Sequence, residues 1–207
     1  MIQWEVVRHQ VAITGRVTDV QTRQAIGGAL VSIMDAPAAF TNRLALRAQQ
    51  YGPAWVSMLE RPDRTTTAPD GHFHFLDLPD GQYTLMASLP GSGSRYGTVQ
   101  ATATIARDAQ GKLTLAAAPM ALPPTALKGQ INGPDGNPVA IAAVQVKGSG
   151  ESTFTDGQGQ YLLAGLEIGT RAVLVSARGF QPATQTVALS QAGAVQTLNV
   201  TLARSTS

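Results

Sequence analysis

The sequence lacks cysteine and has few charged and aromatic residues. Of its 207 residues none is cysteine, 14% are charged and 5% are aromatic. Without cysteine, disulfide bonds, thiol nucleophiles and thiolate metal sites are excluded. A formal net charge of +2 is too small to indicate nucleic-acid binding. There is also no apolar run of about 18 residues, the length needed to cross a bilayer, so we expect no membrane insertion.

The N-terminus shows no secretion signal. Residues 1–8 (MIQWEVVR) do not combine a basic start with a following apolar run. If Met1 is the natural start, we expect a protein that stays in the cytoplasm or joins a particle assembled there. If a leader has been removed, we expect a periplasmic or secreted protein.

Glycine and proline are frequent. There are 21 glycines and 12 prolines, a composition typical of many short strands joined by turns. An all-β fold is therefore expected.

Four sequence blocks occur twice, in the same order. The pairs are 13–19 (ITGRVTD) with 127–133 (LKGQING), 27–33 (GGALVSI) with 140–146 (AIAAVQV), 67–75 (TAPDGHFHF) with 155–163 (TDGQGQYLL), and 78–85 (LPDGQYTL) with 166–173 (LEIGTRAV). Repeated blocks in one order indicate an internal duplication.

The repeated blocks have the pattern of β-strands. Ile13, Gly15 and Val17 alternate with polar residues, and Phe73 and Phe75 alternate with histidines. A period of two predicts strands with one buried face. The turn dipeptides Asp70-Gly71 and Asp80-Gly81 flank the short run that contains Phe73 and Phe75. Each copy thus supplies about seven short strands, enough for a small β-sandwich.

The order of these motifs resembles the carboxypeptidase regulatory-like domain. The motifs are a glycine in the first strand, a turn, a small-Ala-x-Val segment, Thr-Asp-x-x-Gly-x-Tyr/Phe and then Leu-x-x-Gly-x-Tyr, and residues 177–180 (ARGF) add the family's small-x-Gly-aromatic segment. The resemblance implies two tandem transthyretin-like (Ig-like) β-sandwiches. It also implies accessory modules without catalysis, and leaves the partner open.

A proline-rich stretch predicts the boundary between the copies. Residues 116–124 (AAAPMALPP) disfavour both helix and sheet ladder. We therefore expect a first sandwich at 1–118, a linker at 119–124 and a second sandwich at 125–207.

The first copy carries an insertion at about 34–64 that the second lacks. Asp35 is predicted to cap a helix, with Pro37 in its first turn and Gly52-Pro53 at its end. Apolar residues recur at helical spacing at Phe40, Leu44, Ala48 and Tyr51, followed by a shorter run with Trp55 and Met58.

Two interpretations of the insertion stay open. Its apolar stripe caps the open side of its own sandwich, or it presents aromatic and arginine side chains to a partner protein. The candidate partner-binding residues are Trp4, Phe40, Arg43, Leu44, Arg47, Tyr51, Trp55 and Met58. Nucleic-acid binding by Arg43, Arg47, Arg61 and Arg64 is disfavoured, because glutamines and acids interrupt the basic residues.

The segment 2–11 alternates weakly between apolar and polar residues. It is expected to form an edge strand of the first sandwich or to pair with a neighbouring subunit by strand addition.

Catalytic and metal-binding signatures are scarce. His72 and His74 lie two apart on a predicted strand and share a face, but a zinc site normally needs three or four protein ligands. The glycine-rich 91–97 (GSGSRYG) is neither a G-x-S-x-G elbow nor a G-x-G-x-x-G loop. We expect no enzyme, cofactor or metal.

The favoured hypothesis is a structural or adaptor subunit that contacts other protein subunits in a larger assembly, for example a phage-tail-like or contractile injection particle. The alternative is a surface or periplasmic module that binds glycan or peptide through an aromatic platform at Tyr96 or Trp55. The sequence does not predict the partner or the oligomeric state.

Overall fold

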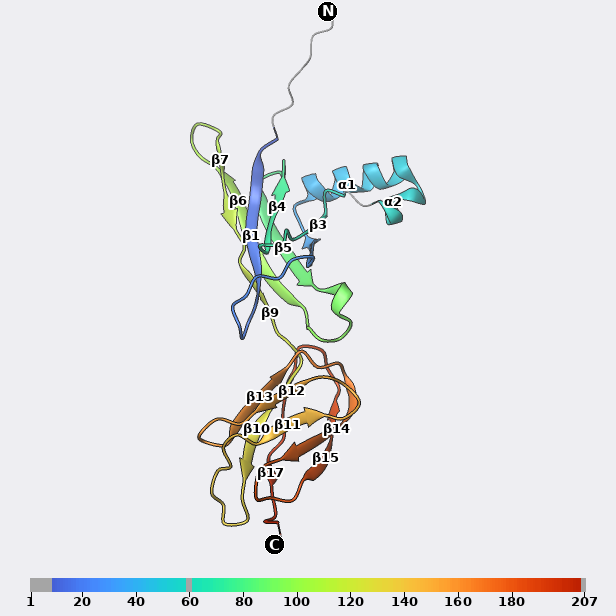
Figure 1. Ribbon diagram of the computed structural model, residues 1–207. Coiled ribbons are helices and arrows are strands. Elements are labelled where there is room, and N and C mark those ends of the chain that lie inside the picture. The colour runs from blue at the N-terminus through green and yellow to red at the C-terminus, as the bar shows by residue number, and fades with distance from the viewer. Residues whose placement is uncertain (1–8, 59–60, 206–207) are drawn as a thin grey trace, which may run out of the picture. The chain divides into compact units, whose positions relative to one another are not determined.

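Strands predominate in the computed structural model, which describes residues 9–58 and 61–205 (Figure 1). The chain divides into two compact units. One consists of Met1–Gly91 and Thr98–Leu122, the other of Ser92–Gly97 and Pro123–Ser207. The described strands form four sheets, two in each unit, which confirms the predicted all-β class of two sandwiches.

The first unit pairs a small sheet with a larger one. The small sheet has the order β4-β1-β8, and β9 also pairs with β1; the larger has the order β3-β2-β5-β6-β7. The elements are β1 (Val11–Asp19), β2 (Leu30–Asp35), α1 (Ala38–Tyr51), α2 (Ala54–Ser57), β3 (Arg64–Thr66), β4 (His72–Leu76), β5 (Gly81–Ser88), η1 (Pro90–Ser92), β6 (Val99–Arg107), β7 (Leu113–Thr114), β8 (Ala116–Ala117) and β9 (Met120–Leu122).

The second unit repeats this plan, and its described residues include no α-helix. One sheet has the order β13-β10-β16, with β17 also paired to β10, and the other has the order β12-β11-β14-β15. The strands are β10 (Ala126–Asn132), β11 (Ala143–Val146), β12 (Ser152–Phe154), β13 (Gln160–Ala164), β14 (Gly169–Ser176), β15 (Ala183–Leu189), β16 (Val195–Thr197) and β17 (Val200–Thr201).

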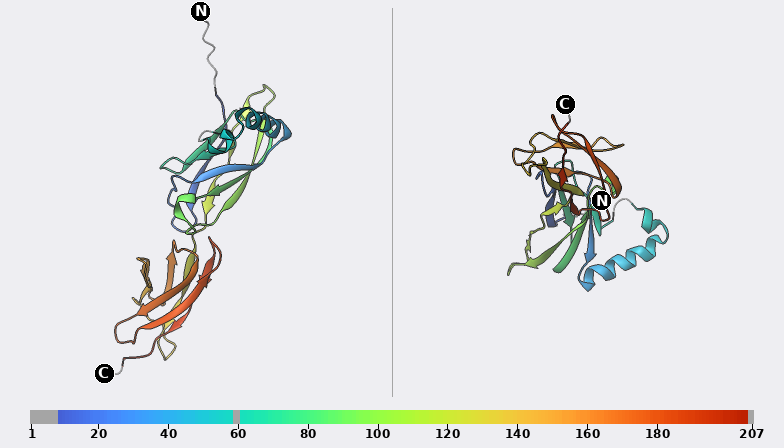
Figure 2. Two further views of the ribbon diagram at one scale, coloured as in Figure 1. Left: turned by 90° about the vertical axis from the view of Figure 1, so that its right-hand side faces the viewer. Right: turned by 90° about the horizontal axis from the view of Figure 1, so that it is seen from below.

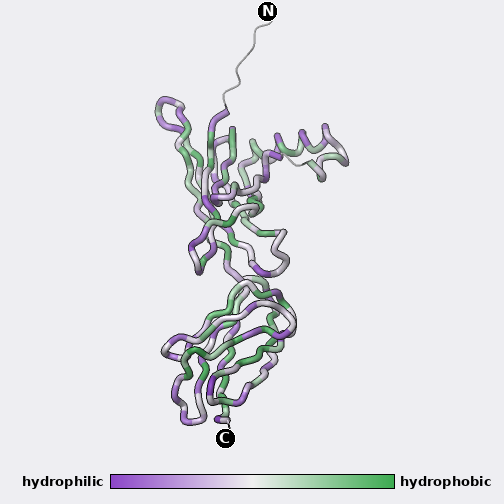
Figure 3. Tube along the Cα trace, in the orientation of Figure 1, coloured by the Kyte–Doolittle hydropathy of each residue, from purple (hydrophilic) through white to green (hydrophobic). Residues whose placement is uncertain are grey.

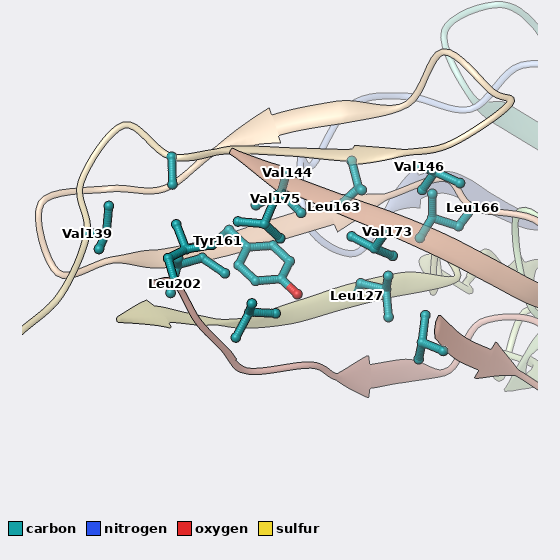
Figure 4. Close-up of a cluster of buried hydrophobic side chains, with 14 of the residues drawn as sticks. Leu127, Val139, Val144, Val146, Tyr161, Leu163, Leu166, Val173, Val175 and Leu202 are labelled. Atoms are coloured by element: carbon teal, nitrogen blue, oxygen red, sulfur yellow. The ribbon is translucent and has the colours of Figure 1, made fainter. Parts of the chain in front are cut away.

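Alternating side chains build both cores, as the period of two predicts. In β4, Phe73 and Phe75 are buried while His72 and His74 are exposed. Hydrophobic segments follow the strands, and the loop joining β6 and β7 is hydrophilic (Figure 3). In the second unit, valines and leucines from both sheets surround the ring of Tyr161 (Figure 4). Each sheet therefore buries one face against its partner.

A glycine in the first strand of each unit allows a backbone to pass closely. A Cβ atom on Gly15 would lie 2.2 Å from the Ala118 carbonyl oxygen, and one on Gly129 would lie 2.0 Å from that of Leu198. At these points the last strand of each copy breaks into two pieces, β8 and β9 or β16 and β17, that pair with the same first strand. Only glycine leaves room for this interruption.

The second unit includes residues 92–97, the loop after η1. Arg95 donates hydrogen bonds to Glu151 Oε1 at 2.8 Å and to the Gly165 carbonyl at 2.6 Å. Thr125 Oγ1 donates to the Ser94 carbonyl at 2.7 Å. These bonds join residues far apart in the chain, so no local sequence pattern predicts them.

Two local predictions differ from the structure. The helix α1 begins at Ala38 with Pro37 at its N-cap, so Asp35 lies too early to cap it and accepts a bond from its neighbour Ala36 instead. The predicted linker is in part a strand, because β9 (Met120–Leu122) pairs in parallel with β1. Prolines at 119, 123 and 124 flank β9 rather than interrupt it, which keeps its amide groups available for the ladder.

Candidate functional site

The helical insertion is anchored at its start by Phe40. This side chain is 1% exposed and its ring meets that of Tyr83 on β5 edge to face, with centroids 5.9 Å apart. Tyr83 donates its hydroxyl to the Pro79 carbonyl at 2.8 Å, and burial raises the pKa of Tyr83 to about 12. The first turn of α1 is thereby part of the core of its unit.

The far end of the insertion is held by a small cluster around Trp55. This ring is buried, with Tyr51 stacked at 6.2 Å and the Arg61 guanidinium 4.5 Å from its centroid. Asp63 accepts two bonds from Arg61, one of them at 2.8 Å from Nε, and this pairing raises the pKa of Arg61. Cation–π contact and ion pair together hold α2 beside the returning chain.

Three large apolar side chains on the helices of the same insertion are exposed. Leu46 is 62% exposed, Tyr51 51% and Val56 76%. The two helices extend away from the strands (Figures 1 and 2), so side chains beyond the first turn of α1 have little of the sandwich to cover them. We refer to Leu46, Tyr51 and Val56 as the outer face.

The predicted candidates therefore separate into three groups. Phe40 and Trp55 are buried, Leu44 and Met58 are half-buried, and Arg43, Arg47 and Tyr51 are exposed. Trp4 and most of the segment 2–11 lie outside the described residues. Phe40 and Trp55 thus cap the core of the first unit, and a partner-binding role for the exposed residues stays a prediction.

A groove of about 1050 Å³ lies between the insertion and β4. Its lining includes Arg43 and Arg47 from α1, Arg61 and Arg64 from the returning chain, and His74 and Asp77 at the end of β4. We refer to it as the arginine groove. In the sequence, glutamines and acids separate these four arginines. In the structure, the insertion brings them together beside β4.

Asp77 organises one end of the arginine groove. It has a left-handed backbone, with φ of 53°, and accepts bonds from the His9 ring and from the Gln10 amide at 2.8 Å. The bond to His9, then that to Gln10, lowers the pKa of Asp77. Its carbonyl accepts a bond from Arg43 at 3.0 Å. The pairing of Asp77 with His9 was not predicted, because no local motif reveals a bond that spans 68 positions.

The histidine pair of β4 does not form part of a ligand cluster. His72 and His74 are exposed, and His72 faces Asp70 with Nδ1 and Oδ2 3.2 Å apart. Within residues 9–58 and 61–205 no group of three or more histidine, aspartate or glutamate side chains is arranged to hold a metal ion. The two histidines are therefore exposed hydrogen-bonding side chains on one face of β4.

The second unit has a groove at the corresponding place. It has a volume of about 700 Å³ and is lined by residues of β10, β12 and β13, among them Lys128, Phe154 and Leu162. Phe154 is 64% exposed and Leu162 43%. No arginine of the described chain lines it, although Lys128 does, so the cluster of arginines belongs to the copy with the insertion.

Comparison with known families assigns the fold. The profile of the carboxypeptidase regulatory-like domain matches residues 12–115 and 126–203. The chain belongs to this family. The two matched segments coincide with the two copies seen in the sequence, and the first contains the insertion. The predicted family is therefore confirmed.

Several solved structures are similar at low identity. The shaft pilin SpaA from Lactobacillus rhamnosus GG has 13% identity and a TM-score of 0.43, covering 96% of this chain and 98% of that one. A cohesin–X-dockerin complex from Acetivibrio cellulolyticus has 20% identity and a TM-score of 0.31, covering 38% of this chain. The Bacillus anthracis TIE protein has 13% identity and a TM-score of 0.37, covering 94% of this chain.

The chain spans 56% of the length of the matched chain in the cohesin complex and 34% of the TIE protein. Similarities of this strength do not indicate what this chain binds. The comparison with curated proteins gives no match. Among the described residues no helix combines the length and apolar character that crossing a bilayer requires.

Proposed function

We propose that this protein is a non-catalytic structural or adaptor subunit, and that it contacts another protein through the outer face of its helical insertion. The observation that carries the proposal is the exposure of Leu46, Tyr51 and Val56 on helices that extend away from the sandwich. Leaving leucine, tyrosine and valine side chains exposed to water costs free energy. A partner that covers them recovers that free energy, and tyrosine is common at the centre of such interfaces.

The internal anchors of the insertion support this role. Phe40 and Trp55 are buried within the unit, so the outer face is held by packing at both ends. An interface presented on a preorganised element loses less conformational entropy on binding than one on a free loop. Membership of a family of accessory modules agrees with a subunit that binds without catalysis. Assembly into a phage-tail-like or contractile injection particle is the setting we propose.

The glycan- or peptide-binding alternative loses its expected platform. Trp55 is buried under Tyr51 and Arg61, and Tyr96 is half-buried. Binding through such a platform needs an accessible aromatic ring. We therefore favour the adaptor.

Site-specific photocrosslinking tests the proposed surface. A photoactivatable amino acid replaces Val56 in one variant and, as a matched control, Leu115, which is 54% exposed in the connection between β7 and β8. Both are irradiated in the native host. We expect a discrete adduct with one other protein at position 56 and none at 115. Adducts at both positions, or at neither, contradict the proposal.

A further inference from the structure

The arginine groove carries more positive charge than its own residues neutralise. Arg61 is paired with Asp63. Arg43 and Arg64 donate to the neutral carbonyls of Asp77 and Met58. Arg47 has no hydrogen bond or ion pair with any residue of 9–58 or 61–205. Among the described residues, three guanidinium groups thus have no carboxylate partner of their own.

The acids that line the groove do not balance these charges. Asp77 is the one carboxylate in its described lining, and it is bonded to His9. Glu60, which precedes Arg61, lies outside the described residues. Like charges gathered in a concave site raise the local potential and attract anions.

The shape of the groove favours an extended ligand. Its lining includes Thr65 and Thr66 of β3 and residues 74–76 of β4. Within the described chain β3 forms a ladder only with β2, apart from a single bridge between Arg61 and Arg64, and β4 forms one only with β1. Both are therefore edge strands of their sheets. Edge strands beside a groove are suited to an added peptide strand, whose backbone supplies the missing ladder bonds.

The charge pattern favours a peptide over a nucleic acid. Four arginines line this groove, but the formal net charge of the whole chain is only +2. Nucleic-acid binding draws on a run of phosphate contacts along a basic track. Carboxylates, by contrast, are matched one by one by arginine, often through two parallel hydrogen bonds.

We infer that the arginine groove binds an extended acidic peptide segment of a partner protein, with carboxylates on Arg43, Arg47 and Arg64. The inference rests on the proposed function in that the ligand is a protein, but it concerns a surface distinct from the outer face.

Fluorescence anisotropy with the full chain tests the inference. The probe is a fluorescein-labelled peptide of alternating glutamate and valine, and a serine-valine peptide is the neutral control. We expect the acidic peptide to bind, the neutral one not to, and salt to weaken binding. Replacing Arg43 and Arg47 together (R43Q/R47Q) should weaken binding about tenfold or more, as expected for lost charge-assisted bonds.

Matched variants distinguish binding in the groove from attraction by the overall charge of the protein. R178Q with K147Q removes the same charge from exposed positions outside the groove and should leave the affinity within about twofold. Because R43Q loses the bond to Asp77, R47Q alone is the second test: Arg47 has no bonding partner within the described chain, so its loss does not threaten folding. Equal weakening by both double variants overturns the inference.

Other ligands give distinct results. Full competition by inorganic phosphate, or tighter binding of a single-stranded oligonucleotide through Arg43 and Arg47, overturns the peptide assignment. Failure here is also distinguishable from failure of the proposed function. An adduct at position 56 without peptide binding contradicts only the peptide site in the arginine groove. Peptide binding without that adduct contradicts only the role of the outer face.

Discussion

The two copies in this chain share a scaffold and differ on one side of it. Gly15 pairs with Phe73 in the first copy, and Gly129 pairs with Tyr161 at the same register in the second. A buried threonine is also conserved between the copies. Thr67 Oγ1 accepts the Ala29 amide at 2.9 Å and donates to the Ile26 carbonyl at 2.7 Å.

Thr155 repeats this bonding in the second copy, with the Ala142 amide at 2.8 Å and the Val139 carbonyl at 2.7 Å. The scaffold is thus defined by a few close backbone approaches and buried hydrogen bonds that survive although most side chains have changed.

The differences concentrate around the insertion. Tyr83 is fully buried beneath Phe40, whereas its counterpart Arg171 is half-buried and donates to the Glu167 carbonyl at 3.1 Å. Asp77, which binds the segment before β1, stands where the second copy has Gly165. An added element therefore changes the residues beneath and beside it, and these are the residues that give the first copy its surface features.

Replacing Phe40 should have the largest effect on stability, and it should affect the first unit alone. Phe40→Ala uncovers Tyr83 and empties a buried site, so we expect about 3–4 kcal/mol of destabilisation in the first unit and none in the second. Urea unfolding followed by hydrogen exchange of each unit measures this. Leu46→Ala on the same helix, 62% exposed, is the control and should change stability by less than about 0.5 kcal/mol. A loss no larger than that of the control means that Phe40 is not core.

The close-approach glycines should respond alike in both copies. Gly15→Ala and Gly129→Ala place a Cβ against a carbonyl oxygen at 2.2 and 2.0 Å, so each should destabilise its own unit by about 3 kcal/mol. Gly150→Ala is the control, because nothing lies within 4 Å of its added Cβ. If the three variants unfold at the same urea concentration, the close backbone approaches at Gly15 and Gly129 do not require glycine.

Alkaline pH should weaken both units in parallel. Burial raises the pKa of Tyr83 and of Tyr161 to about 12 each. The unfolded chain releases these protons near pH 10, so between about pH 10 and 12 the folded state binds more protons than the unfolded state. Stability then falls as pH rises, by up to about 2 kcal/mol for each tyrosine.

Tyr83→Phe and Tyr161→Phe should each remove the decline in one unit and leave it in the other. Melting of each unit as a function of pH measures this. A decline that persists in the substituted unit contradicts the assignment to its tyrosine.

Exchanging one turn residue between the copies should have the smallest effect on stability. Gly28 has φ of 76° and its counterpart Ile141 has φ of 56°. Ile141 is a β-branched residue in the left-handed region with a side chain 76% exposed. Ile141→Asn should stabilise the second unit by about 1 kcal/mol, since asparagine tolerates this backbone conformation better.

The reverse exchange, Gly28→Ile, should destabilise the first unit by about 1–2 kcal/mol. The added Cβ atom meets no steric obstacle, because nothing lies within 4 Å of it. Thermal unfolding measures both variants, and a stabilising Gly28→Ile would refute the account of backbone strain.

The sequence was most informative where structure depends on local pattern. Alternation predicted the strands around Ile13 and Phe73, and Gly52, with φ of 54°, ends α1 as expected. It failed where distant parts of the chain decide the outcome. β9 forms because β1 lies open beside it, and the arginines converge because the insertion returns to β4. Neither fact has a local signature.

The central claim is that the insertion docks this subunit onto another protein. The most direct measurement is sedimentation of native lysate, with the chain followed by mass spectrometry across the gradient, for the natural protein and for the outer-face variant L46S/V56S. We predict that the natural protein travels with a heavy particle of defined composition, and that the variant melts at the same temperature but stays at the top. If the natural protein itself sediments as a free monomer, or the variant still enters the particle, the claim is contradicted.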